Sequence, residues 1–298
     1  MNAPRPETVE RLAPGIRRVL APNPSPMTYW GTNSYIIGEG EVAVIDPGPA
    51  EPAHLRAILD ALAPGERITH ILVTHSHLDH SALAGPLSQA TGAPVLAFGD
   101  SRAGRSEVME RLARAGLSGG GEGVDAGFAP HERLRDGQVI SGPGWRITAL
   151  WTPGHFGNHL CFALGDALFT GDHVMGWASS LVSPPDGDLT AFMASTRRLA
   201  ARRDRIYYPG HGAPVERPGQ RIRWLLEHRR SREAALLEAL AGGPATLAEL
   251  AARVYTDIPA RMRPMAERNA FAHLVDLVRH SRVRAEPELS LAARFSRV

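Results

Sequence analysis

Short apolar runs alternate with helical stretches over the first two thirds of the chain. Strand-forming runs separated by turn residues favour an α/β layered fold, because each segment must bury one face against a neighbouring layer. Helical spacing predicts helices over residues 52–62, 83–91 and 189–200. The predicted strands occupy residues 16–20, 34–37, 42–45, 68–74, 94–98, 145–151, 159–164, 167–170 and 206–208.

After Pro218 the apolar positions change to helical spacing. A first stripe ends at Gly242-Gly243-Pro244 and consists of Ile222, Leu225, Leu226, Leu236, Leu237 and Leu240. Thr246 followed by Glu249 has the spacing of a capping box and predicts the start of a second helix. A third helix is predicted from Phe271, Leu274, Val275 and Val278. We therefore predict two domains, residues 1–215 and residues 216–298, the second a small, helical, winged-helix-like domain.

The length and composition agree with a two-domain globular protein. The chain has 298 residues, of which 43% are hydrophobic and 21% charged, and one hydrophobic core rarely serves so long a chain. No apolar run approaches the roughly 18 to 20 residues that span a bilayer, and no secretory leader is recognisable. The single cysteine, Cys161, excludes an internal disulfide. We expect a cytoplasmic protein without a membrane partner.

Charge is distributed unevenly along the chain. Residues 1–196 carry 13 arginines and 20 acidic residues, whereas residues 197–298 carry 20 arginines and 11 acidic residues. A basic tail beside an acidic domain can indicate a nucleic-acid surface. The chain contains no lysine, however, so arginine must also serve as the ordinary solvated cation of its helices. Both interpretations stay open at this level.

Residues 74–80 read THSHLDH and follow directly after a predicted apolar strand. A chain that leaves a strand through a tight turn can present His75 and His77 to one metal ion. Asp79 and His80, at the start of the next helix, can then reach a second ion. Four ligand-type residues at such a junction indicate two adjacent metal sites rather than buried structural histidines.

Three further predicted strands end in a turn followed by a ligand-type residue. The three turns are residues 152–155, 170–172 and 208–212, and glycine precedes the ligand in each. Glycine permits close approach of the backbone, and proline stiffens two of these turns. These turns supply the additional candidate ligands His155, Asp172 and His211.

With Asp46, the HxHxDH run, His155, Asp172 and His211 in this order, the chain resembles the metallo-β-lactamase superfamily. The resemblance implies a four-layer αβ/βα sandwich with the metal site at one edge. It implies that His75, His77 and His155 hold one ion, that Asp79, His80 and His211 hold the other, and that Asp172 bridges them. Asp46 resembles the family carboxylate that supports the ligand loop without binding metal.

The ligand chemistry predicts a dinuclear hydrolase. Nitrogen and oxygen ligands without thiolate favour two Zn²⁺, with Mn²⁺ or Fe²⁺ as chemical alternatives. Two ions about 3.5 to 4 Å apart can hold a metal-bridging hydroxide as nucleophile, so Asp79 and Asp172 are the candidate catalytic residues. His159 and His173 are candidates for the proton donor, although we favour a role in supporting the ligands. Residues 177–188 are expected to overhang the site, with Asp188 capping the next helix.

The resemblance leaves several substrates open. Asp172 stands where true β-lactamases of this superfamily have Cys or Ser. Residues 33–35 and 272–277 and the appended domain most resemble the mitochondrial β-lactamase-like endoribonucleases, which implies cleavage of phosphodiester bonds in single-stranded RNA. The alternative is a thioesterase, ester or lactone hydrolase of the glyoxalase II type, which shares the seven ligands. A nucleic-acid-binding module with a vestigial site and a mononuclear iron dioxygenase are further interpretations.

Three expectations concern the surface. If RNA is the substrate, Arg221, Arg229, Arg230 and Arg232 should neutralise phosphates. The tail should dock on the sandwich and is a candidate homodimer surface. The glycine-rich residues 116–127 are interpreted as an exposed loop, either a lid over the site or a plain linker.

Overall fold

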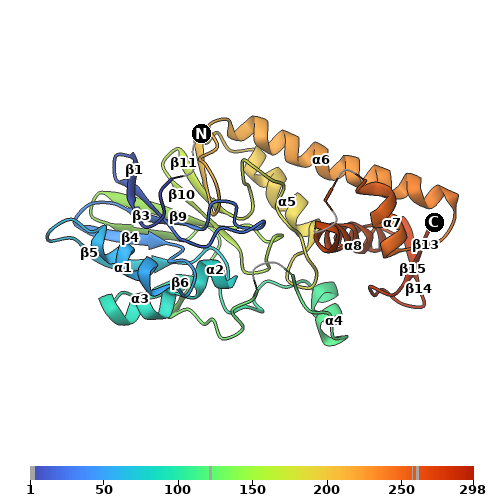
Figure 1. Cartoon of the computed structure of the whole chain (residues 1–298), viewed down its shortest axis with the longest axis horizontal. Helices are drawn as coiled ribbons and strands as arrows, with labels where there is room; N and C mark the ends of the chain where they lie inside the picture. Colours follow the sequence, from blue (N-terminus) through green and yellow to red (C-terminus); the bar gives the residue numbers. More distant parts are fainter. Residues whose placement is uncertain (1–3, 121–122, 257, 260–261) are drawn as a thin grey trace.

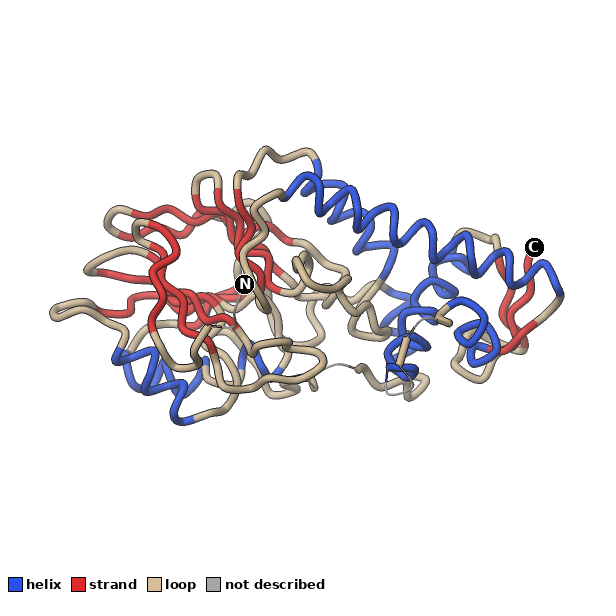
Figure 2. The backbone as a smooth tube through the Cα atoms, turned by 45° about the horizontal axis from the view of Figure 1, so that its top comes forward, coloured by secondary structure: helices blue, strands red, loops and turns tan. Residues whose placement is uncertain are grey.

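The computed structural model describes residues 4–120, 123–256, 258–259 and 262–298. Two β-sheets face each other and helices cover their outer faces, followed by a separate helical unit (Figures 1 and 2). This arrangement confirms the predicted αβ/βα sandwich with a C-terminal winged-helix-like domain. The long helix α6, Pro218–Ala239, begins beside the sandwich and extends along the helical unit.

The first sheet has seven strands in sequence order. Strands β1 to β4 are antiparallel, and β4 to β7 run parallel. The three parallel pairs need crossover connections, which contain α1, α2 with α3, and α4 in turn. The elements of this half are β1 Val9–Ala13, β2 Ile16–Leu20, β3 Asn33–Ile37, β4 Glu41–Ile45, α1 Pro52–Asp60, β5 Arg67–Leu72, α2 Leu78–Ser81, α3 Ala84–Thr91, β6 Val95–Ala97, α4 Glu107–Arg114 and β7 Glu132–Arg133.

The second sheet has five strands in the order β12-β11-β10-β9-β8. Only β12 runs parallel to its neighbour β11, because helix α5 connects the two. The elements are β8 Val139–Gly142, β9 Trp145–Trp151, β10 Leu160–Leu164, β11 Ala167–Gly171, α5 Leu189–Ala200 and β12 Ile206–Pro209.

Three apolar layers hold the sandwich together. The inner faces of both sheets meet through side chains such as Tyr35, Ile147 and Phe162, which are almost completely buried. Outside the first sheet, Ile58 of α1 and Leu87 of α3 pack against the strands. Outside the second sheet, α5 and the first turns of α6 do the same. The strands therefore read as nearly continuous apolar runs, as expected of sheets covered on both faces.

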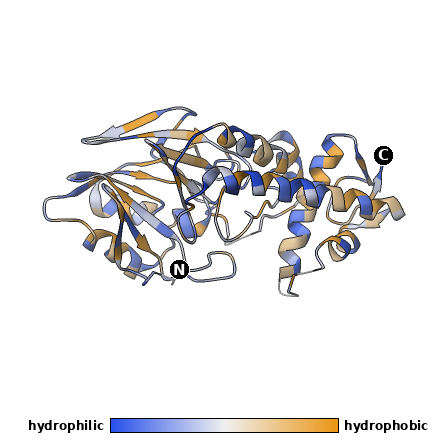
Figure 3. Ribbon diagram, turned by 90° about the horizontal axis from the view of Figure 1, so that it is seen from above, coloured by the Kyte–Doolittle hydropathy of each residue, from blue (hydrophilic) through white to orange (hydrophobic). Residues whose placement is uncertain are grey.

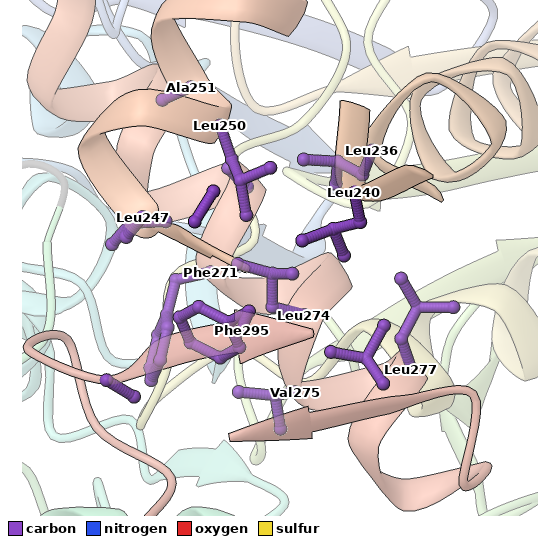
Figure 4. Close-up of a cluster of buried hydrophobic side chains, with 14 of the residues drawn as sticks. Leu236, Leu240, Leu247, Leu250, Ala251, Phe271, Leu274, Val275, Leu277 and Phe295 are labelled. Carbon is purple, nitrogen blue, oxygen red and sulfur yellow. The ribbon is translucent and has the colours of Figure 1, made fainter. Parts of the chain in front are cut away.

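The C-terminal domain has a core that also takes in Met109 and Leu112 of α4. Its elements after α6 are the 3₁₀ turn η1 Leu240–Gly242, β13 Ala245–Thr246, α7 Leu247–Val254, α8 Arg263–Arg279, β14 Val283–Glu286 and β15 Arg294–Arg297. The predicted capping box is present, since Thr246 and Glu249 each accept the other's backbone N–H. Strands β13, β15 and β14 form a separate small sheet. Leucine and phenylalanine side chains from α6, α7, α8 and β15 point toward one another (Figure 4).

A substitution of Phe271 tests the packing of this core, because the Phe271 ring is fully buried among the helices and β15. Replacing Phe271 by alanine is expected to destabilise the folded protein by about 3 to 5 kcal/mol, the cost of removing a buried ring and leaving a cavity. Thermal unfolding measures this. Leu291→Ala, at a side chain that is 40% exposed, is the control and should change the midpoint by little. Equal effects of the two substitutions would contradict the packing described.

The glycine-rich segment is not a plain linker. The amide of Leu78 donates to the carbonyl of Gly123, and the amide of Asp125 donates to the carbonyl of Ser76. An isolated β-bridge also joins His77 and Val124. The described part of the segment therefore lies against the turn that carries the predicted ligands, where the sequence indicated only an exposed loop. Residues 121 and 122 lie outside the described residues.

The two domains are joined by polar contacts as well as by α6. Arg279 of α8 pairs with Asp188 at 2.9 Å, and Asp188 also caps α5 as predicted, accepting from the amide of Ala191. The amide of Val182 donates to Asn269. Seen from above, the outer face of α6 is largely hydrophilic (Figure 3). In the described parts of the chain, no helix combines the length and apolar character needed to cross a bilayer.

Candidate metal centre

The predicted ligands come from four strand ends on one edge of the sandwich. His75 and His77 lie in the turn after β5, Asp79 and His80 lie in α2, and the other three follow β9, β11 and β12. All seven side chains are buried, with at most 7% of any residue exposed. The structure thus brings together every residue that the sequence singled out as a metal ligand: His75, His77, Asp79, His80, His155, Asp172 and His211.

The first group consists of His75, His77, His155 and Asp172. Nδ1 of His77 lies 2.9 Å from Nε2 of His75 and 3.1 Å from Nε2 of His155. Nε2 of His155 is 3.6 Å from Oδ2 of Asp172. Ligand atoms bound at about 2.0 to 2.2 Å around a tetrahedral ion lie roughly 3.4 Å apart. These separations suit one small cation.

The second group consists of Asp79, His80 and His211. Nε2 of His211 lies 3.2 Å from Oδ2 of Asp79 and 3.2 Å from Nε2 of His80. Asp172 also reaches this group, with Oδ1 3.4 Å from Nε2 of His80 and Oδ2 3.3 Å from Nε2 of His211. Because the two oxygens of Asp172 face both groups, its carboxylate occupies the position of a bridging ligand.

The outer ring nitrogens fix which inner nitrogens carry lone pairs. Nδ1 of His155 contacts the carbonyl of Leu181 at 2.7 Å, and Nδ1 of His211 contacts the carbonyl of Gly31 at 3.1 Å. A carbonyl only accepts hydrogen bonds, so both nitrogens must carry the proton. In the neutral rings Nε2 then presents a lone pair to the centre. Such outer contacts commonly orient histidines that bind metal.

Asp46 supports the ligand turn from below. Its Oδ1 accepts from the amide of Thr74 at 2.7 Å, and its Oδ2 accepts from the hydroxyl of Thr74 at 2.8 Å. The same Oδ2 lies 2.9 Å from Nδ1 of His80, which places the lone pair of His80 Nε2 at the centre. The hydroxyl of Thr74 also contacts Nδ1 of His75 at 3.0 Å. One carboxylate thereby orients a ligand of each group, in agreement with the supporting role that the family resemblance implies.

The two ligand groups differ in the direction in which the pKa values of their histidines are shifted. Burial, together with neighbouring His155, lowers the pKa of His77 to about 3, so this ring is neutral. Burial also opposes protonation of His211, but Asp172 and Asp79 outweigh it and raise the pKa of His211 to about 10. Burial disfavours the charged carboxylate of Asp172, yet His211 and His80 hold its pKa well below the usual range. The second group thus holds ionised carboxylates that demand positive charge.

These residues fit a pair of metal ions. Nε2 of His80, His155 and His211 faces the centre and would present a lone pair to a bound metal ion, and Oδ1 of Asp172 accepts no hydrogen bond from the described side chains. The raised pKa values of His211 and His80 show that the carboxylates hold positive charge at this group, and a metal ion bound there would take the place of those protons. The donor set of histidines and carboxylates suits Zn²⁺, with Mn²⁺ and Fe²⁺ as alternatives.

His159 and His173 lie behind the ligands. Nδ1 of His159 contacts the hydroxyl of Thr152 at 2.9 Å, and Nε2 of His173 contacts the hydroxyl of Thr196 at 3.0 Å. Both rings are fully buried. Burial lowers the pKa of His173 to about 3, with His155 adding to the effect. This placement agrees with support of the ligand layer rather than proton donation to a substrate.

Phe156 and Thr32 also contact the ligands but were not among the predicted site residues. The ring of Phe156 is fully buried and packs edge-on against His77, with centroids 5.0 Å apart. The hydroxyl of Thr32 donates to Oδ2 of Asp79 at 3.2 Å. A β-bridge from Thr32 to His211 joins the loop before β3 to the loop after β12. The pairing of these two loops could not be inferred from residue spacing.

Gly210 shows why glycine precedes a ligand. A Cβ atom at this position would lie 2.5 Å from Oδ1 of Asp172 and 2.6 Å from Cε1 of His80. Gly154 is restricted in another way, since its φ is +148° and a Cβ would meet the backbone of Phe192 at 2.3 Å. Both glycines permit the close approach that the sequence pattern predicted.

An apolar pocket of about 250 Å³ lies between the two domains. The loop before β3 contributes Met27 and the loop after β11 contributes Trp177 and Leu181. Tyr255 and Met265 of the helical domain close the other side. Trp177 stacks on Tyr29 with ring centroids 4.8 Å apart, and Tyr29 stacks in turn on Trp30.

The catalytic domain, over residues 27–211, matches the family model described as metallo-beta-lactamase superfamily. The chain belongs to the metallo-β-lactamase superfamily. Residues 246–292 match a second model, the beta-lactamase associated winged helix domain. These matches account for both units of the fold and make the chain a metallo-hydrolase of this superfamily, with two adjacent groups of residues that could each hold a metal ion.

Similar proteins within the superfamily include named thioesterases. The chain is 33% identical over 274 residues to the atrochrysone carboxyl ACP thioesterase of Aspergillus fumigatus, covering 85% of this chain and 77% of that protein. It is also 33% identical to the lactamase-like protein adaB of Aspergillus niger, covering 80% and 68%. The matches confirm the predicted superfamily with a winged-helix domain, and the predicted likeness to endoribonucleases stays a prediction that none of these relatives bears out.

Solved structures share the whole architecture. A metallo-beta-lactamase family protein from Thermus thermophilus has a TM-score of 0.76 and 27% identity, covering 97% of this chain and 100% of that chain. A beta-lactamase domain protein from Burkholderia ambifaria has a TM-score of 0.81 at 22% identity, covering 100% and 95%. At that identity the second likeness concerns the fold alone.

Three arginines of α6 make hydrogen bonds within the protein. Arg221 donates to the carbonyls of Met175 and Ala178, both at 2.6 Å. Arg229 is 2% exposed and donates to the carbonyl of Ser180 and to Asn269. Arg232 donates to the carbonyl of Val254 at 2.8 Å. The expectation that these side chains face phosphates is therefore wrong for the buried Arg229, and Arg221 and Arg232 already donate to protein carbonyls. For the exposed Arg230 it stays a prediction.

Proposed function

We propose that the chain is a dinuclear metal-dependent thioesterase, which hydrolyses an acyl group from a thiol carrier such as coenzyme A or a carrier protein. The observation that carries the proposal is the seven-ligand centre, complete with Asp172, in a protein that also has a mostly apolar pocket between its two domains, where Arg232 and His228 are the basic side chains of the lining. The named thioesterases among the relatives support it. Hydrolysis of oxygen esters or lactones by the same site is the neighbouring chemistry.

Bound at this centre, a metal pair supplies a hydroxide nucleophile near neutral pH and polarises the acyl carbonyl. The protein residues orient the reactants. Asp79 is held by the hydroxyl of Thr32, so its carboxylate can accept a hydrogen bond from the attacking water and direct it at the carbonyl carbon. Buried Phe156 and the surrounding ligand rings keep bulk water from the ligand layer.

The position of His159 and His173 favours a thiol as leaving group. Both side chains lie behind the ligands and are bonded to threonine hydroxyls, so neither offers a proton to the substrate side. A thiolate, with a pKa of about 8.5, can leave without a proton donor. An alkoxide, the leaving group in RNA cleavage, is far more basic, near the value of about 15.7 for water. Thioester cleavage therefore does not require a proton donor for the leaving group, whereas RNA cleavage would.

A substrate comparison tests the proposal. Purified protein with measured metal content is expected to hydrolyse acyl-coenzyme A or S-lactoylglutathione with kcat/KM on the order of 10⁴ M⁻¹s⁻¹, and to leave single-stranded RNA uncut at low salt. Chelation should abolish the thioesterase activity and re-addition of Zn²⁺ should restore it. Efficient metal-dependent cleavage of RNA with no activity on thioesters would overturn the proposal in favour of phosphodiester hydrolysis.

A further inference from the structure

We infer that the apolar pocket between the two domains binds the acyl chain of the substrate and sets the length of chain that the enzyme accepts. This inference rests on the proposed thioesterase function. It adds a specificity site made jointly by the catalytic and winged-helix domains, with Met27, Met175, Trp177 and Leu181 on one side and Tyr255 and Met265 on the other.

The pocket and the metal centre share their supporting segments. The loop with Met27 continues to Gly31, whose carbonyl accepts from the ligand His211. The loop with Met175 begins at the ligand Asp172, and Leu181, which lines the pocket, accepts from the ligand His155 through its carbonyl. The two loops that wall the pocket therefore also hold the outer faces of the ligands, which connects the pocket directly to the metal centre.

The lining suits an apolar, conformationally variable group. Methionine side chains are flexible and polarisable, so four of them (Met27, Met175, Met262 and Met265) can adapt to chains of different shape. Trp177 lines the pocket, and its ring stacks on that of Tyr29. Arg221 donates to the carbonyl of Ala178, which anchors this wall to α6. A chain entering here replaces water along both domains.

The pocket volume limits the length of the chain. A water-sized group occupies roughly 30 Å³ in a liquid, so about 250 Å³ holds approximately eight carbon atoms. Each methylene removed from water contributes a factor of about four to affinity. An octanoyl thioester is therefore expected to exceed an acetyl thioester in kcat/KM by about 100-fold or more, even if only part of the chain is buried.

Filling or enlarging the pocket tests the inference. Ala178 lines it with a small side chain, so Ala178→Phe should lower kcat/KM for octanoyl-coenzyme A by about 10-fold or more and change that for acetyl-coenzyme A less than about 2-fold. Met265→Ala should shift the preference toward longer chains. Ala292→Phe, at an exposed alanine of the winged-helix domain, is the control and should leave kcat/KM for both substrates unaffected.

A binding measurement separates this inference from the proposed function. Calorimetry with S-octyl-coenzyme A and S-ethyl-coenzyme A, which cannot be hydrolysed, should show tighter binding of the octyl compound, and Ala178→Phe should remove that difference. If the wild-type enzyme cleaves no thioester yet this difference is found, the proposed reaction fails and the pocket assignment stands. Equal affinities for the two compounds, or an unchanged difference in Ala178→Phe, would overturn the pocket assignment.

Discussion

Asp172→Ala is expected to reduce kcat/KM by at least about 1000-fold and to lower the metal content from about two equivalents per chain to one or fewer. Asp172 is the residue whose carboxylate oxygens face both ligand groups, at 3.3 to 3.6 Å from the nitrogens of His80, His155 and His211. Removing it leaves three nitrogen ligands for one ion and a weakened set for the other. Elemental analysis and the thioesterase assay measure the two effects.

Asp166→Ala is the matched control for this experiment. Asp166 is an exposed carboxylate in the turn before β11, where it pairs with Arg205 at 3.0 Å. Surface pairs of this kind contribute little to stability, so the variant should retain both metal equivalents and full activity. An Asp172→Ala protein that keeps two equivalents and normal turnover would show that this carboxylate is not a shared ligand, and the dinuclear assignment would fail with it.

The sequence predicted the metal ligands because their chemistry is local. Residues 74–80 place four ligand types in one turn, and His155, Asp172 and His211 each follow a glycine at a strand end. Strand ends on the same edge of a sandwich must come close together once the sheets pack. The prediction therefore needed only the order of the strands, not the packing of individual side chains.

The backbone contacts of the ligands and the partners of the arginines could not be predicted from the sequence. The carbonyls of Gly31 and Leu181 orient His211 and His155, but a carbonyl is present at every residue and leaves no pattern. The charge of the tail suggested phosphate binding, whereas Arg229 is buried and bonded to Ser180 and Asn269. Net charge counts cations without showing which of them are already bonded, so the substrate inferred from it was the weakest part of the prediction.

Asp46 gives the second large expected effect, because it orients both ligand groups without being a ligand. Its carboxylate faces three donors: the amide and hydroxyl of Thr74 and Nδ1 of His80. Asn at this position keeps the shape but turns one oxygen into an NH₂ donor. Either the bond to His80 or a bond to Thr74 must then be lost, or His80 must move its proton to the nitrogen that faces the centre.

We therefore expect Asp46→Asn to weaken binding of one of the two ions and to lower kcat/KM by about 10- to 100-fold, the usual effect of removing such a supporting contact. Excess Zn²⁺ should restore much of the activity, because all seven ligands are still present. Asp60→Asn, an exposed position in α1, should behave like the wild type in metal titration. A merely structural role for Asp46 predicts a lower unfolding temperature with unchanged metal affinity and no rescue by Zn²⁺, and that result would remove Asp46 from the metal centre.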